Sequence, residues 1–142
     1  MTHVATRSVD YARSQVGVTE RGSNNYGPQV KEYLAAVGIP EGNPWCLALV
    51  AWVMRESGVK DWPMTGDTWA LEDWARAKGL IRTQPSVGDV FLLMGVNDRP
   101  VHTGFVTAVY VDSISSIEGN TGGPSDTDGD GVYAKTRPIG AC

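Results

Sequence analysis

Apolar residues in the first half of the chain recur at the spacing of a helix. Val9, Ala12 and Val16 fall on one helical face before Gly17, and a polar, turn-rich stretch occupies 22–28. Three further helices are predicted, one over 28–37 with Pro28 in its first turn, one over about 45–57, and one that Asp67 or Thr68 caps and Gly79 ends. The helix over 45–57 is so apolar that we expect it to be central and buried on most sides.

The second half changes to short runs rich in Val, Ile, Thr, Phe and Tyr, which predict strands. These strands are expected over 89–94, 103–111, 113–118 and 132–136. Helices followed by strands with brief connections predict an α+β fold, in which N-terminal helices pack on a small antiparallel β-sheet. Because no internal repeat or linker is visible, we expect one catalytic domain over 1–142.

Composition narrows the function classes. The 142 residues are 42% hydrophobic and 20% charged, as in an ordinary globular enzyme, and the net charge of −4 argues against a nucleic-acid partner. No apolar run approaches the roughly 20 residues that span a membrane. The first residues lack the apolar core of a signal peptide. We therefore expect a chain made in soluble form, which something else must carry if it acts outside the cytoplasm.

Cys46 is the first candidate for chemistry. It sits near the first turn of the most apolar predicted helix, where free backbone N–H groups and the helix dipole favour a thiolate and could hold an oxyanion. The alternative is a buried structural cysteine, which is common. The other cysteine, Cys142, is the last residue and is expected to be inert.

His102 and the segment Glu118-Gly119-Asn120 supply the remaining groups. A nucleophilic cysteine needs a base, and the base needs a group that orients it. His102 opens a predicted strand, whereas His3 lies near the terminus and is treated as inert. Glu118 and Asn120 are two residues apart at the end of the next strand, so both are expected on one side, with Gly119 leaving room for a close approach. Either side chain could orient His102, and a merely polar strand end is the alternative.

Together, these features resemble the CHAP domain, a papain-like family of cysteine amidases and endopeptidases related to the NlpC-type peptidases. The matching stretches are 43–50, 87–90, 101–106 and 117–121, within a resemblance that runs from about Tyr11 to Arg137. In the family, the first stretch carries the nucleophile, the third the base, and the fourth an acidic or amide orienter with a supporting Asn. The resemblance thus implies a papain-like fold and four catalytic residues, Cys46, His102, Glu118 and Asn120.

The resemblance also implies a substrate, bacterial peptidoglycan. The bond cut would join N-acetylmuramic acid to L-Ala or lie within the stem peptide or crossbridge. No cofactor is implied, and we expect a monomer. Asn25, Tyr26 and Trp45 are the expected substrate-binding residues, and Trp69 is a further candidate for the cleft. Another papain-like enzyme (a transpeptidase or deamidase) and a non-catalytic wall-binding module remain alternatives, and the setting is open between a phage endolysin, an antibacterial effector and an excised domain.

An acidic run over 126–131 offers a different chemistry. Asp126, Asp128 and Asp130 match the first half of a calcium loop. The twelfth position of such a loop should be a bidentate Glu, and here it is Arg137. We therefore expect a solvated turn and no metal, with a calcium-binding surface protein as the alternative.

Overall fold

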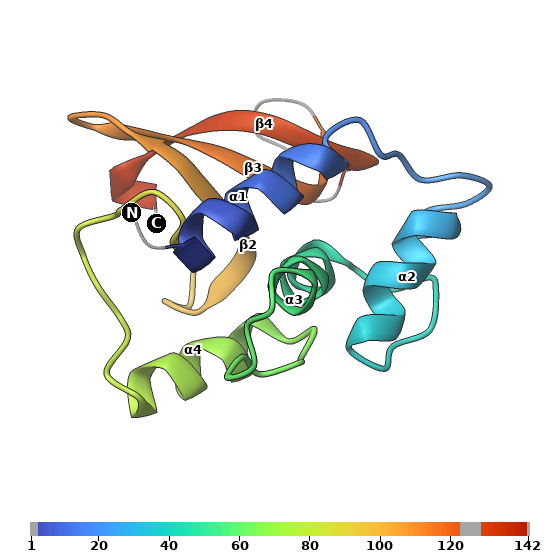
Figure 1. Cartoon of the computed structure of the whole chain (residues 1–142), viewed down its shortest axis with the longest axis horizontal. Coiled ribbons are helices and arrows are strands. Elements are labelled where there is room, and N and C mark those ends of the chain that lie inside the picture. Colours follow the sequence, from blue (N-terminus) through green and yellow to red (C-terminus); the bar gives the residue numbers. More distant parts are fainter. Residues whose placement is uncertain (1–2, 123–128, 142) are drawn as a thin grey trace.

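The computed structural model describes residues 3–122 and 129–141, in which helices come first and strands follow (Figure 1). The helices are α1 (His3–Gln15), α2 (Pro28–Ala36), α3 (Cys46–Glu56) and α4 (Thr68–Ala77). The strands are β1 (Val90–Met94), β2 (Pro100–Val109), β3 (Ser113–Thr121) and β4 (Gly131–Pro138), followed by a 3-10 turn, η1 (Ile139–Ala141). This order confirms the predicted α+β class. None of the helices in these ranges is long and apolar enough to cross a membrane.

The strands form one antiparallel sheet in the order β1-β2-β3-β4, so each strand pairs with its neighbour in sequence. β2 begins at Pro100, earlier than predicted, and a proline is tolerated as the first residue of a strand. β3 continues past the predicted end at 118 to Thr121, with a register shift after Glu118. Asn120 lies in this irregular part and has a left-handed φ of 54°. Both differences place candidate residues inside strands rather than beside them.

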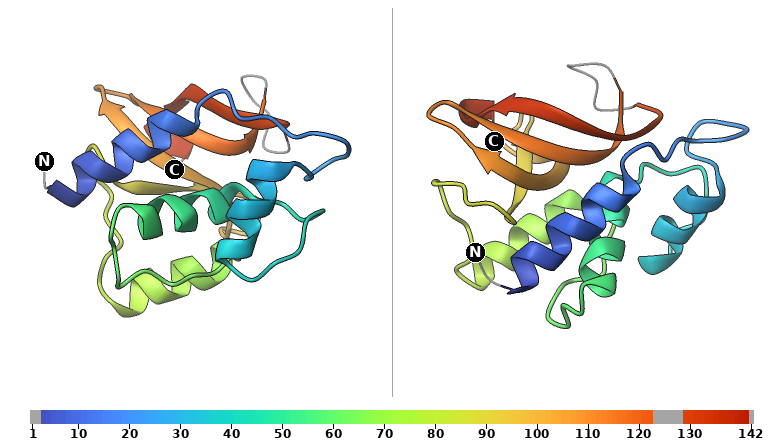
Figure 2. Two further views of the ribbon diagram at one scale, coloured as in Figure 1. Left: turned by 45° about the vertical axis from the view of Figure 1, so that its right-hand side comes forward. Right: turned by 45° about the horizontal axis from the view of Figure 1, so that its top comes forward.

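α3 is the centre of the core, as its composition predicts. Its side chains from Cys46 to Ala51 are all buried, and it packs against α1, α2, β2 and β3. Figures 1 and 2 show the helices together on one side of the twisted sheet. Phe105 of β2 belongs to this main core, whereas its neighbour Val106 belongs to a smaller cluster with Phe91 and Ile114. Successive strand residues point to opposite faces, so the sheet has apolar contacts on both faces.

Candidate active site

Cys46 is the first residue of α3, at the position that the sequence predicts. Trp45 occupies the capping position before the helix, and its side chain makes no capping hydrogen bond. The backbone N–H groups at a helix start have no partner within the helix, and the positive end of the dipole lies there. The thiol is free and only 9% of Cys46 is exposed. Cys46 thus lies where an anion is stabilised, at the edge of the core.

His102 of β2 and Glu118 of β3 form a buried pair. The His102 Nε2 lies 2.8 Å from the Glu118 Oε1, and neither residue is exposed to solvent. The other ring nitrogen, Nδ1, is buried and forms no hydrogen bond of good geometry within the described ranges. Of the two candidate orienters, it is therefore Glu118, and not Asn120, that contacts the imidazole.

Charge and burial act on this pair in opposite directions. Burial is the largest influence on His102 and lowers its pKa, but hydrogen bonding and charge from Cys46 and Glu118 outweigh burial and raise the pKa from 6.5 to about 9. Burial also raises the pKa of Glu118, yet hydrogen bonds from Arg137, His102 and Ser116 lower it to about 2. The structure thus favours an imidazolium beside an ionised carboxylate. Since Cys46 is one of the causes of the raised pKa of His102, the nucleophile and base candidates interact.

Glu118 has two further partners that the sequence does not reveal. Arg137 of β4 donates from Nε to Oε2 at 2.9 Å and from Nη2 to Oε1 at 2.6 Å, and the Ser116 hydroxyl donates to Oε2 at 2.6 Å. In the sequence, Arg137 was considered only as the residue at the twelfth position of the acidic run, where a calcium loop would need a Glu. Its place here depends on the β3–β4 register, which pairs Arg137 with Ile114, and no local pattern signals that register.

Two glycines make room for this arrangement. A Cβ on Gly119 would lie 2.8 Å from the Leu49 Cδ2 and 2.9 Å from the Trp45 ring, so its absence lets β3 approach the start of α3. This confirms the close approach expected at Gly119. A Cβ on Gly104 would lie 2.7 Å from the Glu118 Cγ and 2.7 Å from the carbonyl oxygen of Ile117. Gly104 therefore leaves the space across which Glu118 reaches His102.

Asn120 lies two residues beyond Glu118, where the pairing of β3 with β4 is irregular. It was placed on the same side as Glu118 by strand alternation, and the register shift between Glu118 and Thr121 interrupts that alternation. Asn120 is 2% exposed, and within the described chain its buried Oδ1 has no hydrogen-bond partner. A catalytic role for Asn120 stays a prediction, but orienting His102 by a direct hydrogen bond is not that role.

Two of the three expected substrate-binding residues are buried. Trp45 is fully buried, and its indole N–H donates to the Glu20 carboxylate at 2.8 Å while its ring stacks on Tyr33. Asn25 is 5% exposed in a left-handed turn, and its backbone carbonyl oxygen accepts from the Gly42 N–H. Within the described residues, its side-chain Oδ1 is buried without a hydrogen-bond partner. Trp45 and Asn25 therefore offer little or no surface to a substrate in this structure, and substrate binding by either residue stays a prediction. Tyr26 is 41% exposed, so contact with substrate stays a prediction for it.

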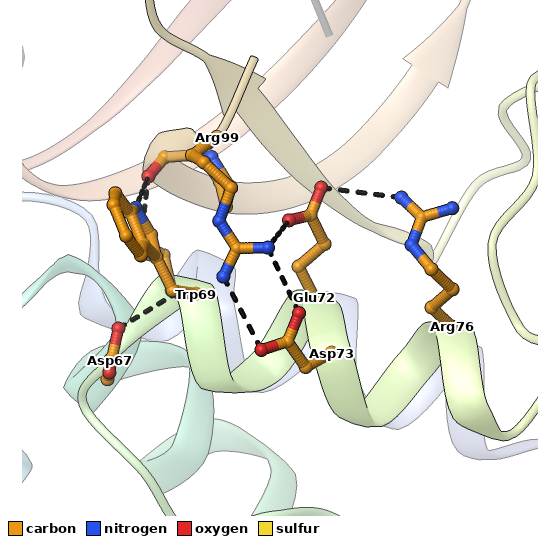
Figure 3. Close-up of polar contacts among 8 residues, drawn as sticks. Asp67, Trp69, Glu72, Asp73, Arg76 and Arg99 are labelled. Atoms are coloured by element: carbon orange, nitrogen blue, oxygen red, sulfur yellow. Dashed lines mark hydrogen bonds and ion pairs between the residues drawn. The ribbon is translucent and has the colours of Figure 1, made fainter. Parts of the chain in front are cut away.

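Trp69, the other aromatic candidate, is held at the surface beside the start of β2 (Figure 3). Its indole N–H donates to the Pro100 carbonyl oxygen at 3.2 Å, and the Arg99 guanidinium lies 4.6 Å from the ring centroid. Arg99 is fixed in turn by Glu72 at 2.7 Å and Asp73 at 3.0 Å. Trp69 is still 49% exposed, so a fixed aromatic surface lies near the strand that carries His102.

The acidic run lies largely outside the described residues, which leave out Asp126 and Asp128. Asp130 is described, and its carboxylate accepts a hydrogen bond from the Tyr133 hydroxyl at 2.7 Å. Across 3–122 and 129–141, no three His, Cys, Asp or Glu side chains gather as a metal site would require.

A cysteine at a helix start, with a histidine and carboxylate on neighbouring strands, is typical of cysteine-dependent hydrolases. Residues 38–120 match the model of the CHAP domain, which is more than half of the chain, so this chain belongs to the CHAP family. CHAP domains are generally hydrolases that act on peptidoglycan. The matched range contains Cys46, His102, Glu118 and Asn120, and it ends before Arg137.

A solved structure has a similar fold. The crystal structure of Ly7917 superposes with a TM-score of 0.54 at 20% sequence identity, over 96% of this chain and 57% of that one. This chain therefore spans little more than half the length of Ly7917, and the likeness concerns the fold. A comparison with curated protein sequences gave no match.

The space at Gly104 generates a prediction. In Gly104→Ala, the methyl group should displace Glu118 from the imidazole, and the pKa of His102 should fall from about 9 because it loses the neighbouring negative charge. Overpacking should also cost about 1–3 kcal/mol of stability. NMR titration of the imidazole signals measures this directly, since the chain has 2 histidines and His3 serves as an internal reference.

Gly140→Ala is the matched control, because a Cβ there would meet nothing within 4 Å. That variant should titrate and melt like the wild type. A His102 titration unchanged in a folded Gly104→Ala protein would show that Glu118 does not depend on this space.

Proposed function

We propose that this protein is a cysteine peptidoglycan hydrolase that cleaves an amide bond of the bacterial cell wall, with Cys46 as nucleophile and His102 as base. The observation that carries the proposal is the buried His102–Glu118 pair, whose imidazolium interacts with a thiol at the start of α3. Membership of the CHAP family supports peptidoglycan as the substrate class.

Acylation follows from the charges at the site. The Cys46 thiolate attacks the amide carbonyl, and backbone N–H groups at the start of α3 stabilise the oxyanion, by about 3–4 kcal/mol for one such donor in known enzymes. The imidazolium of His102 then gives its proton to the leaving amine, which departs as the thioester forms. A raised pKa of His102 suits this step, because the ring must carry a proton before the amine can leave.

Deacylation uses the same groups in the reverse sense. Neutral His102 takes a proton from water, the resulting hydroxide attacks the thioester, and a carboxylic acid and the Cys46 thiolate are released. Glu118 stabilises the imidazolium that forms in this step by charge and by its 2.8 Å contact with Nε2. No step requires a group from outside the chain other than water and the substrate, and residues 1–142 act as one catalytic domain in a monomer.

The substrate bond is either the N-acetylmuramoyl-L-alanine amide or a bond of the stem peptide or crossbridge, in wall reached from the periplasm or the exterior. A transpeptidase would use the same thioester but pass it to an amine, so its product would be a new amide. Mass spectrometry of muropeptides from digested sacculi distinguishes these products and identifies the bond.

Cys46→Ala tests the nucleophile. It removes only the sulfur, so wall hydrolysis should be abolished while the melting temperature stays close to that of the wild type. Cys142→Ser is the matched control and should keep full activity. Release of muropeptides from purified sacculi is the measurement, and lysis by Cys46→Ala at a rate near that of wild type would refute the proposed function.

Glu118→Gln tests the orienting carboxylate. The variant keeps the shape and loses the charge, so the rate should fall by about 10–1000-fold, the span set by general-base assistance. The alkaline limb of the pH–rate profile, expected near pH 9 in the wild type, should move to lower pH because the imidazolium loses its stabilising charge. A profile recorded on the same wall substrate for both proteins checks this, and an alkaline limb that does not move would exclude Glu118 from the site.

Trp69 is a proposed substrate surface. A strand rises about 3.3 Å per residue, so Pro100, which Trp69 contacts, lies within about 7 Å of His102 along β2. Trp69→Ala should raise KM for soluble muropeptides several-fold with a smaller change in kcat, whereas Trp69→Phe, which keeps an aromatic face, should lose less. Tyr110→Ala is the control, because Tyr110 is 57% exposed and follows the opposite end of β2. Equal KM values for wild type and Trp69→Ala would remove Trp69 from the substrate surface.

A further inference from the structure

Arg137 is joined to the active-site pair by geometry that neither the family match nor the proposed chemistry uses. Ile114, Ser116 and Glu118 alternate along β3 and share one face, and Arg137 of β4 joins this face because it pairs with Ile114. Its side chain meets Glu118 with two hydrogen bonds, Nε to Oε2 at 2.9 Å and Nη2 to Oε1 at 2.6 Å. Arg137 is 7% exposed and Glu118 not at all. This is a buried, two-point ion pair, the strong kind.

The ion pair is not needed to hold β4 on the sheet. The backbones of β3 and β4 pair without interruption from Ser113↔Pro138 to Glu118↔Tyr133. The two long side chains therefore add something to a strand pair that is already formed. What they add is a fixed direction for the carboxylate, whose Oε1 is shared between Arg137 and His102.

The charges facing the pair come from four elements. Cys46 of α3 and Glu118 of β3 act on His102, and Arg137 of β4 and His102 of β2 act on Glu118, with the neutral Ser116 hydroxyl beside it. A guanidinium keeps its charge at every pH a protein meets. The Glu118 carboxylate is therefore compensated whether or not His102 carries a proton. Without Arg137, the Glu118 carboxylate would be buried and uncompensated whenever His102 is neutral, and such a charge is costly.

We propose that Arg137 is a positioning residue for the base: it fixes the Glu118 carboxylate toward His102 and offsets part of its negative charge. This rests on the proposed function, in which His102 must give up a proton in one step and take one in the next. In both steps the direction of the carboxylate decides how well Glu118 stabilises the imidazolium, and Arg137 fixes that direction.

The test uses the opposite signs expected for the two partners of one ion pair. Removing the positive charge in Arg137→Met should raise the pKa of His102 above its wild-type value, by about one unit or more if it follows the usual effect of a nearby charge. Removing the negative charge in Glu118→Gln should lower it. Arg137→Lys keeps the positive charge but lacks the planar guanidinium that makes two hydrogen bonds. In this variant the pKa of His102 should stay close to the wild-type value, while kcat falls and KM is unchanged, because the Glu118 carboxylate is less well oriented. A purely structural role would not produce this pattern of signs.

Imidazole NMR titration gives the readout without any wall substrate, with His3 as the internal reference. Arg82→Met is the matched control. Arg82 also forms an ion pair with a carboxylate, that of Asp89, but its side chain is 57% exposed, so the variant removes the same charge from a solvated pair. It should leave the His102 titration unchanged. A folded Arg137→Met protein in which the pKa of His102 is equal to or below the wild-type value would overturn the proposal.

A second pair of variants covers a failure of Arg137→Met to fold. Glu118→Gln/Arg137→Met removes both charges and leaves no uncompensated charge in the network. Its His102 should titrate above that of Glu118→Gln alone, because only the arginine charge differs between them, and equal values would overturn the proposal. The outcome is separate from that of the proposed function: the expected signs in a protein that releases no muropeptides would keep Arg137 in its role and refute peptidoglycan as the substrate.

Discussion

The Glu118 carboxylate is the group on which the rest of the site depends. It is fully buried, and a buried carboxylate is stable only when its oxygens are satisfied. Hydrogen bonds reach it from His102 on β2, from Arg137 on β4 and from Ser116 two residues before it. Only a strand with a neighbour on each side can collect partners from both, and the sheet order β1-β2-β3-β4 makes β3 such a strand. The meander therefore places an imidazole on one neighbour of this strand and a permanent cation on the other.

Cys46, the proposed nucleophile, joins this network because the helical layer approaches the sheet closely at one point. Gly119 has no side chain where Leu49 and Trp45 press against β3, so the start of α3 lies against the strand that carries Glu118. Trp45 cannot move freely, because its indole N–H is tied to Glu20 and its ring is stacked on Tyr33. The residue before the nucleophile is thus part of the core, and Cys46 keeps its place at the edge of the core.

The sequence predicted the elements and three of the interacting residues because their signals are local. Helical spacing, turn residues and β-branched runs locate the helices and strands, and Cys46, His102 and Glu118 each stand at a recognisable point of one element. Arg137 was missed because its role depends on the β3–β4 register, which is a long-range property. The burial of Trp45 was not predicted, because its partner Glu20 is distant in sequence. The direction expected for Asn120 relied on strand alternation, which a register shift after Glu118 interrupts, and nothing local in Glu118-Gly119-Asn120 announces that shift.

Burial strengthens the charge network, and it also decides what a substrate can touch. His102 and Glu118 are closed off from solvent, so the 9% of Cys46 that is exposed is the part of the trio that a substrate meets first. The exposed aromatic residues stand beside the two segments that lead to the reacting groups. Tyr26 packs on Gly42 in the turn before α3, and Trp69 is bonded to Pro100 at the start of β2. In this arrangement the aromatic rings of Tyr26 and Trp69 lie at the surface and the His102–Glu118 pair lies in the interior. Cys46, only 9% exposed, lies at the boundary between them.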